Sequence, residues 1–169
     1  MLSLAPWQNS DLALLRQQNT EAMTEHLGGP ESEQKIVLRH HRYLAYWQNG
    51  GAWPFRLEFD ERPVGSITFW ETERNDEPVF EAGWAILPEF QGRGFATGGM
   101  RLVIEHARGL GSRRYIHASP GISNLASNGV CRSAGFELLG QEEIEYPVGS
   151  MMAVSTWRFD LWESAHAEK

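Results

Sequence analysis

The 169-residue sequence contains a single cysteine, Cys131, and no long run of apolar residues. One cysteine excludes an internal disulfide and any zinc or iron–sulfur site built from several cysteines. No apolar segment approaches the roughly 20 residues that a membrane-spanning helix needs. The first residues also lack the basic segment followed by an apolar one that is typical of a secretion signal. We therefore expect a cytoplasmic protein that does not bind a membrane.

Positive charge is scarce as well, because 15 Lys and Arg residues face 22 Asp and Glu residues, for a net charge of −7. A protein that binds nucleic acid non-specifically needs a basic face to displace counterions, so we expect no nucleic-acid partner. The 41% of apolar and 22% of charged residues are typical of a folded globular protein. The length fits one domain, which we expect over residues 1–165, with a loose tail at 166–169.

Apolar periodicity and turn-forming residues predict a mixture of strands and helices. The predicted strands cover residues 1–6, 53–59, 64–70, 80–87, 115–118, 136–146 and 151–162. Five helices are predicted. The first ends near residue 18, the second covers one or two turns within 20–27, the third runs from 31 to 49, the fourth begins near 97, and the fifth runs from 124 to 134. We place a turn at residues 73–77. The order of elements is β-α-α-β-β-β-α-β-α-β-β.

A glycine-rich turn connects a strand to a helix at residues 91–97. Glycines let backbone amides face a ligand, and a helix N-terminus adds unpaired N–H groups, so the turn suits a phosphate or pyrophosphate. A Walker A loop is excluded because no lysine follows Gly98-Gly99. A dinucleotide-binding turn is excluded because Gly92, Gly94 and Gly98 miss its spacing by one residue. A plain strand–helix connection is the alternative.

The segment Gln91-Gly92-Arg93-Gly94-Phe95-Ala96 resembles the acyl-CoA signature Gln/Arg-x-x-Gly-x-Gly/Ala of the GNAT N-acetyltransferase superfamily. The flanking blocks 81–84, 87–89, 124–127 and 135–136 resemble the branch that contains ribosomal-protein N-terminal (alanine/serine) acetyltransferases. This resemblance implies an α/β (α+β) fold with a mixed, mostly antiparallel sheet of six or seven strands flanked by helices. It also implies acetyl-CoA as cosubstrate and transfer of the acetyl group to a primary amine, either a protein N-terminus or a small molecule, by direct attack in a ternary complex.

The resemblance assigns the cofactor-binding residues by position. It implies that the pantetheine arm bonds to the main chain of Trp84, Ala85 and Ile86, and that Asn124 contacts the same arm. It places the pyrophosphate on the backbone amides of Gln91, Gly92, Arg93, Gly94, Phe95, Ala96 and Thr97. The alternatives are core packing for Trp84 and Ile86, a solvated side chain for Arg93, and a helix N-cap for Asn124.

Many members of the superfamily carry a tyrosine acid seven residues after that asparagine, where this sequence has Cys131. We interpret Cys131 as a small buried residue, and Ser127, one helical turn after Asn124, as the remaining donor to the leaving thiolate. The attacking amine must lose a proton to a base, directly or through water. Glu145 and His117 are the first candidates for this base and Glu81 is the third, with solvated or structural roles as the alternatives.

The neighbouring pair His40-His41 has no further ligand at metal-binding spacing, so we expect no metal. The loss of the tyrosine favours a second hypothesis, in which the protein is a catalytically weak acyl-CoA-binding sensor or regulator. The spare acidic residues near the last strands argue against this hypothesis. Both a monomer and a homodimer remain open.

Overall fold

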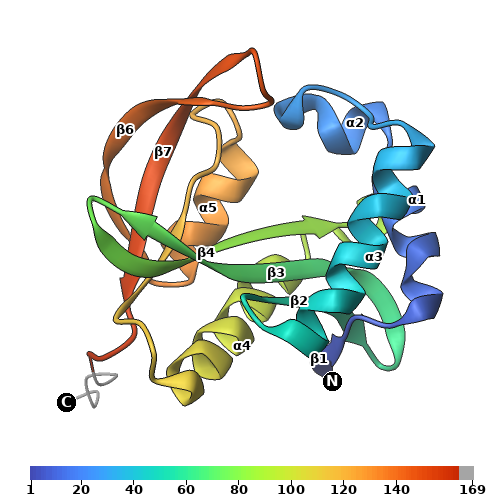
Figure 1. Cartoon of the computed structure of the whole chain (residues 1–169), viewed down its shortest axis with the longest axis horizontal. Helices are drawn as coiled ribbons and strands as arrows, with labels where there is room; N and C mark the ends of the chain where they lie inside the picture. Colours follow the sequence, from blue (N-terminus) through green and yellow to red (C-terminus); the bar gives the residue numbers. More distant parts are fainter. Residues whose placement is uncertain (164–169) are drawn as a thin grey trace.

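The computed structural model describes residues 1–163, so the predicted tail at 166–169 lies outside the described residues. One seven-stranded sheet has the order β1-β2-β3-β4-β5-β7-β6 (Figure 1). Every neighbouring pair of strands is antiparallel except β4 and β5, which are parallel. The predicted mixed, mostly antiparallel sheet flanked by helices is confirmed.

The elements follow the predicted order closely. The strands are β1 (Leu2–Pro6), β2 (Ala52–Phe59), β3 (Arg62–Arg74), β4 (Glu77–Ile86), β5 (Tyr115–Ala118), β6 (Glu137–Glu145) and β7 (Met151–Asp160). The helices are α1 (Leu12–Gln18), α2 (Glu21–Thr24), α3 (Glu33–Asn49), α4 (Phe95–Leu110) and α5 (Leu125–Ser133). The turn predicted at residues 73–77 is shorter, because Asn75 and Asp76 alone form it, with φ of 50° and 62°. Asn and Asp tolerate this left-handed conformation, so β3 and β4 stay paired as far as Arg74 and Glu77.

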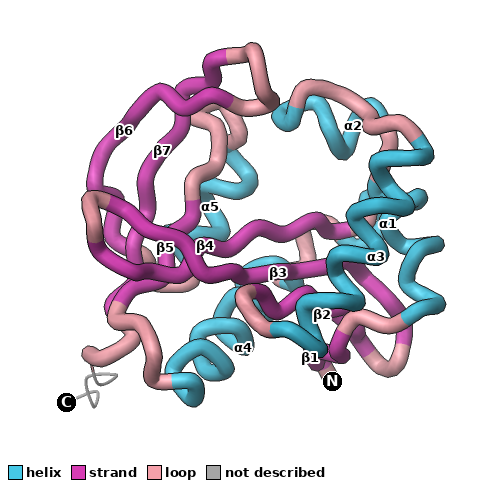
Figure 2. The backbone as a smooth tube through the Cα atoms, in the orientation of Figure 1, coloured by secondary structure: helices cyan, strands magenta, loops and turns pink. Residues whose placement is uncertain are grey.

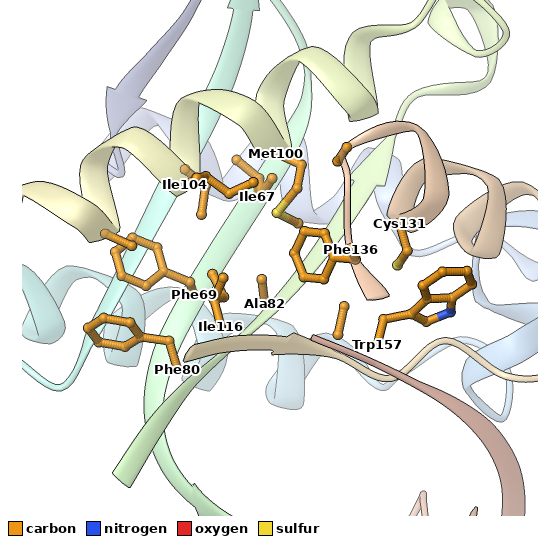
Figure 3. Close-up of a cluster of buried hydrophobic side chains, with 14 of the residues drawn as sticks. Ile67, Phe69, Phe80, Ala82, Met100, Ile104, Ile116, Cys131, Phe136 and Trp157 are labelled. Atoms are coloured by element: carbon orange, nitrogen blue, oxygen red, sulfur yellow. The ribbon is translucent and has the colours of Figure 1, made fainter. Parts of the chain in front are cut away.

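Helix α4 covers one face of β3 and β4. Met100 and Ile104 of α4 meet Ile67 and Phe69 of β3 in the main buried cluster (Figure 3). Trp84 of β4 is half-buried and packs against the same cluster, so its side chain has a core role. The helix therefore covers this face of β4, while the opposite face of the strand carries Glu81 and Gly83.

Helices α1 and α3 stand at the other face of the sheet. Ser32 caps α3 by accepting a hydrogen bond from the Lys35 backbone N–H at 3.3 Å. The predicted stripe on α3 faces inward, with Ile36 and His40 buried. Gln18, at the end of α1, donates to the Ala85 carbonyl at 3.2 Å and accepts from the Ser66 hydroxyl at 3.0 Å. These contacts fasten α1 to the last residues of β4.

The parallel pair β4 and β5 touches at only two positions, Phe80 with Ile116 and Glu81 with His117. Strand β4 then runs on to Ile86, while β5 ends at Ala118 before Pro120 (Figure 2). Along residues 82–86, β4 therefore has no strand partner on the β5 side within residues 1–163. The sheet is split from this point toward the glycine turn and α4.

Candidate functional site

The glycine turn lies at the open end of the split. Gly92 and Gly94 adopt φ of +72° and +77°, a conformation that side-chain-bearing residues rarely adopt. An added Cβ would meet no atom within 4 Å at either glycine, so the backbone conformation requires glycine here. Gly94 is the N-cap of α4, and no side chain caps the first helical N–H groups within the described part of the chain. The turn thus presents backbone donors at the positive end of a helix dipole.

Two side chains bind carbonyl groups of the last residues of β4. Gln91 donates from its amide to the Ile86 carbonyl at 2.9 Å, which folds the start of the turn back onto the strand. Gln18 holds the Ala85 carbonyl, as described above. Gly65 of β3 comes so close to this segment that a Cβ on it would lie 2.3 Å from the Ala85 oxygen. The shape of the β4 edge therefore depends on contacts from β3, α1 and the turn.

Helix α5 follows β5, the strand on the other side of the split. The Asn124 Oδ1 accepts from the Ser127 backbone N–H at 3.1 Å, so the N-cap interpretation of Asn124 is confirmed. Ser127 is half-buried in the first turn of the helix. Asn128, which the sequence analysis missed, is buried, donates to the Gly121 carbonyl at 3.0 Å and accepts from the Trp157 indole at 2.9 Å. Asn128 thereby fixes α5 against β7.

Cys131 lies one turn further along α5 and is fully buried. Burial raises the pKa of its thiol to about 12, so the thiol stays protonated at neutral pH. A protonated, buried thiol is a packing group rather than a nucleophile, as we expected from the sequence.

A polar cluster surrounds the point where β4 and β5 separate. Arg74 donates to the Ser119 hydroxyl at 2.6 Å and to Glu142 of β6 at 2.8 Å, and it lies 3.5 Å from Glu81 of β4. Thr156 of β7 adds a hydrogen bond of 3.1 Å to the same Glu142 oxygen. One arginine thus joins β3, β4, the end of β5 and β6.

His117 of β5 lies beside this cluster and is only 5% exposed. Burial lowers the pKa of its imidazole to about 4, and the positive charges of Arg74 and Arg158 act in the same direction. The ring is therefore neutral at physiological pH. Its Nδ1 is buried and has no hydrogen-bond partner within residues 1–163.

Glu145 lies apart from this cluster, at the last position of β6. Its exposed carboxylate accepts from the Gly149 backbone N–H at 2.7 Å and so closes the hairpin between β6 and β7. The tip of this hairpin reaches the segment after α2 (Figure 1), where a Cβ on Gly28 would lie 2.8 Å from Pro147 Cγ. The structure therefore brings Glu81 and His117 together at the split and places Glu145 at the end of β6, beside the hairpin turn.

Two other features lie away from the split. A cavity of about 470 Å³ between α4, β5 and β7 is lined by ion-paired residues such as Arg108 and Asp160, and none of the glycine-turn residues contributes to it. His40 is buried and accepts from the Trp7 indole at 3.1 Å, so it serves packing, whereas His41 is exposed. Residues 1–163 contain no group of three possible metal ligands and no helix long and apolar enough to cross a membrane.

Comparison with known proteins gives a family match over most of the chain. The model of the acetyltransferase (GNAT) domain matches residues 1–137. No curated protein sequence matches the chain significantly.

Solved structures match over nearly the whole length. An acetyltransferase from Salmonella typhimurium that modifies the N-terminal serine of ribosomal protein L7/L12 has a TM-score of 0.81 at 21% identity, covering 94% of each chain. A spermidine N-acetyltransferase from Vibrio cholerae, solved with CoA and spermine, has a TM-score of 0.78 at 16% identity, covering 95% of each chain. An aminoglycoside acetyltransferase solved with coenzyme A has a TM-score of 0.75 at 18% identity, again over 95% of each chain. At these identities, the likeness shows the fold.

Proposed function

Because the chain belongs to the GNAT acetyltransferase family, we propose that it transfers an acetyl group from acetyl-CoA to a primary amine by direct attack in a ternary complex. The observation that carries this proposal is the split between β4 and β5, which leads to the glycine turn and the N-terminus of α4. The split leaves backbone groups of β4 available to an extended ligand. The turn at its open end offers donors suited to a pyrophosphate.

The residues present fit the cofactor. In the proposal, the amides of residues 91–97 hold the pyrophosphate, and the main chain of Trp84, Ala85 and Ile86 holds the pantetheine arm as an added strand would. The positive φ of Gly92 and Gly94 supports the first assignment, since it turns amides outward without a side chain in the way. Asn124 borders the arm from α5, where its amide already caps the helix.

In the proposal, a group at the split accepts the proton that the attacking amine loses. Glu81 and His117 are supported by their position, because they form the last pair before β4 and β5 separate. The ring of His117 is neutral and can accept a proton, although a pKa near 4 makes it a weak base. Glu145 is already engaged by Gly149, so this role would require the hairpin turn to rearrange.

The pH dependence of kcat/KM identifies this base. In the parent protein, we expect kcat/KM to rise with pH through an apparent pKa. Glu81→Gln, His117→Ala and Glu145→Gln are compared, and the base is the residue whose replacement abolishes that limb. If all three variants keep the parental profile, the proton goes to water and no side chain among these three acts as base.

Ser127 is proposed as the hydrogen-bond donor to the departing thiolate. It lies half-buried in the first turn of α5, the helix that follows β5. Cys131 occupies the position where many family members carry a tyrosine acid, and its own pKa of about 12 leaves it no role as a proton donor.

The acceptor is best searched among the amines of the structural neighbours, namely a peptide N-terminus, an aminoglycoside and a polyamine. Release of free thiol from acetyl-CoA is measured with each amine. The proposal predicts release above the rate of hydrolysis for at least one of them, and slower release by Gly94→Val at cofactor concentrations that just saturate the parent.

Tight binding of acetyl-CoA without turnover of any amine would instead support the sensor hypothesis, which the presence of Cys131 in place of a tyrosine favours. The catalytic proposal places the protein in the cytoplasm, where acetyl-CoA is available as acetyl donor. It needs one chain only, so it holds for a monomer and for a homodimer.

A further inference from the structure

Arg74 stands between two carboxylates at the split. Its guanidinium lies 2.8 Å from Glu142 and 3.5 Å from Glu81, and 2.6 Å from the Ser119 hydroxyl. The side chains of Arg74 and Glu81 are each 21% exposed, and that of Glu142 is 44% exposed. Solvent, and any molecule that reaches this face of β4, can therefore touch the cluster.

The cluster lies next to the proposed reaction centre. Glu81 is the last residue of β4 that pairs with β5, and the free edge of β4 begins at the next residue. Glu81 and Gly83 lie on the same face of β4, opposite to the face that packs against α4. An amine that attacks a thioester held along this edge therefore arrives close to the two carboxylates.

The charges of the cluster nearly cancel. Arg74 carries one positive charge, Glu81 and Glu142 carry two negative charges, and His117 is neutral at physiological pH, which leaves a net charge of −1. The bond from Arg74 lowers the pKa of Glu142, so that carboxylate stays ionised at neutral pH. Without the arginine, the same place would carry two uncompensated negative charges.

Two polar atoms of the cluster have no hydrogen-bond partner among the described residues. The Nε of Arg74 is buried and unpartnered, and so is the Nδ1 of His117. Leaving such an atom without a partner is costly to the fold. The presence of Arg74 at this cost is poorly explained by stability alone. The unpartnered Nδ1 of His117, whose side chain is buried, indicates that a polar group belongs beside it.

We propose that Arg74 determines the choice of acceptor, because its guanidinium fills the site between Glu81 and Glu142 that would otherwise hold a second cationic group of the substrate. The inference rests on the proposed function and narrows it. The acceptor then carries a single ammonium group near the reaction centre, as a peptide N-terminus or a simple amine does. Polyamines and aminoglycosides, which carry several, bind poorly because their second charge finds no free carboxylate pair.

The test compares how tightly a polyamine and a monoamine bind to variants of the cluster. Affinities for spermidine and for propylamine are measured by calorimetry, with and without CoA, so that no turnover is needed. Two uncharged replacements, R74Q and R74M, are made because one of them could fail to fold, and circular dichroism checks both. The expected result is a gain in spermidine affinity of about 3- to 10-fold over propylamine in both variants at low salt, which shrinks as salt is added.

E142Q is the matched control. It breaks the same contact between Arg74 and Glu142, but it removes a carboxylate and brings the net charge of the cluster to zero. We therefore expect no gain in spermidine affinity from E142Q, nor from R74K, which keeps the positive charge. Equal gains in R74Q and E142Q would mean that loosening of β6 is the cause, and no gain in R74Q and R74M would mean that Arg74 does not exclude cations. Either result overturns the inference.

The two proposals fail in different measurements. A parent protein that binds CoA but acetylates no amine contradicts the proposed function, while the order of spermidine affinities still decides the role of Arg74.

Discussion

Replacement of Gly65 by alanine should distort the edge of β4 and destabilise the protein. The added Cβ would lie 2.3 Å from the Ala85 oxygen and 3.0 Å from the Ile86 Cα, both backbone atoms. A relaxed carbon–oxygen contact is about 1 Å longer than the first of these, so β3 and β4 must move apart, and no flexible side chain can yield in their place. Overpacking of this kind costs about 1–3 kcal/mol, and we expect the upper end because backbone must shift.

The same variant should also weaken cofactor binding, because Ala85 and Ile86 are proposed to bond to the pantetheine arm. The assays are urea unfolding for stability and calorimetry for the affinity of acetyl-CoA.

Gly83→Ala is the control for this experiment. Gly83 lies on β4, the neighbour of the strand that carries Gly65. A Cβ on Gly83 would lie 3.6 Å from the Trp70 ring, which is an ordinary contact. Alanine loses less conformational entropy than glycine when a strand forms, so Gly83→Ala should be neutral or more stable by up to about 1 kcal/mol. A Gly65→Ala protein within about 0.5 kcal/mol of the parent would refute the argument from close approach.

Three further predictions concern the turn, the leaving group and acid stability. Gly94→Val should weaken acetyl-CoA binding by at least ~2 kcal/mol, about 30-fold. A branched residue is strained at φ +77°, and in the proposal it stands where the pyrophosphate meets the turn. Unchanged affinity in calorimetry with a folded variant would place the ligand elsewhere. Ser127→Ala should lower kcat by roughly 10- to 100-fold with little change in acetyl-CoA affinity, and a parental kcat would make the serine structural. The free energy of unfolding should fall by up to about 3 kcal/mol as the pH decreases from about 6.5 to 4. In this range His117 takes up a proton in the unfolded chain but not in the folded protein, where its pKa is about 4. Urea unfolding of His117→Gln should show a smaller loss. An equal loss in that variant would assign the acid sensitivity to other groups.

The parts of the site that the sequence predicted are those with a local signal. Gly92 and Gly94 stand directly before α4, and their spacing alone predicted a turn followed by a helix. The cap of α5 by Asn124 is equally local, since its partner is three residues away. The end of β3 was predicted too early because the residues from Glu71 to Arg74 are mostly polar, whereas pairing with β4 keeps them in the strand.

The parts that the sequence could not predict depend on distant contacts. Arg74 meets Ser119 and Glu142 across 45 and 68 positions of the chain, and no spacing rule connects these residues. The low pKa of His117 likewise arises from burial and from Arg74 and Arg158 on two other strands. Glu145 is the opposite case, because its partner Gly149 is four residues away and the hairpin turn around it was already predicted.

Hydrogen exchange of the backbone amides, measured with and without acetyl-CoA, tests the location of the cofactor most directly. We expect slower exchange on addition of acetyl-CoA in residues 82–86 of β4, which have no partner on the β5 side, and in the glycine turn, residues 91–97. Exchange in α3, which packs against β2 and α1, should stay as it is. Slower exchange confined instead to the walls of the 470 Å³ cavity between α4 and β7, with residues 82–97 unchanged, would contradict the proposal that the split sheet holds the cofactor.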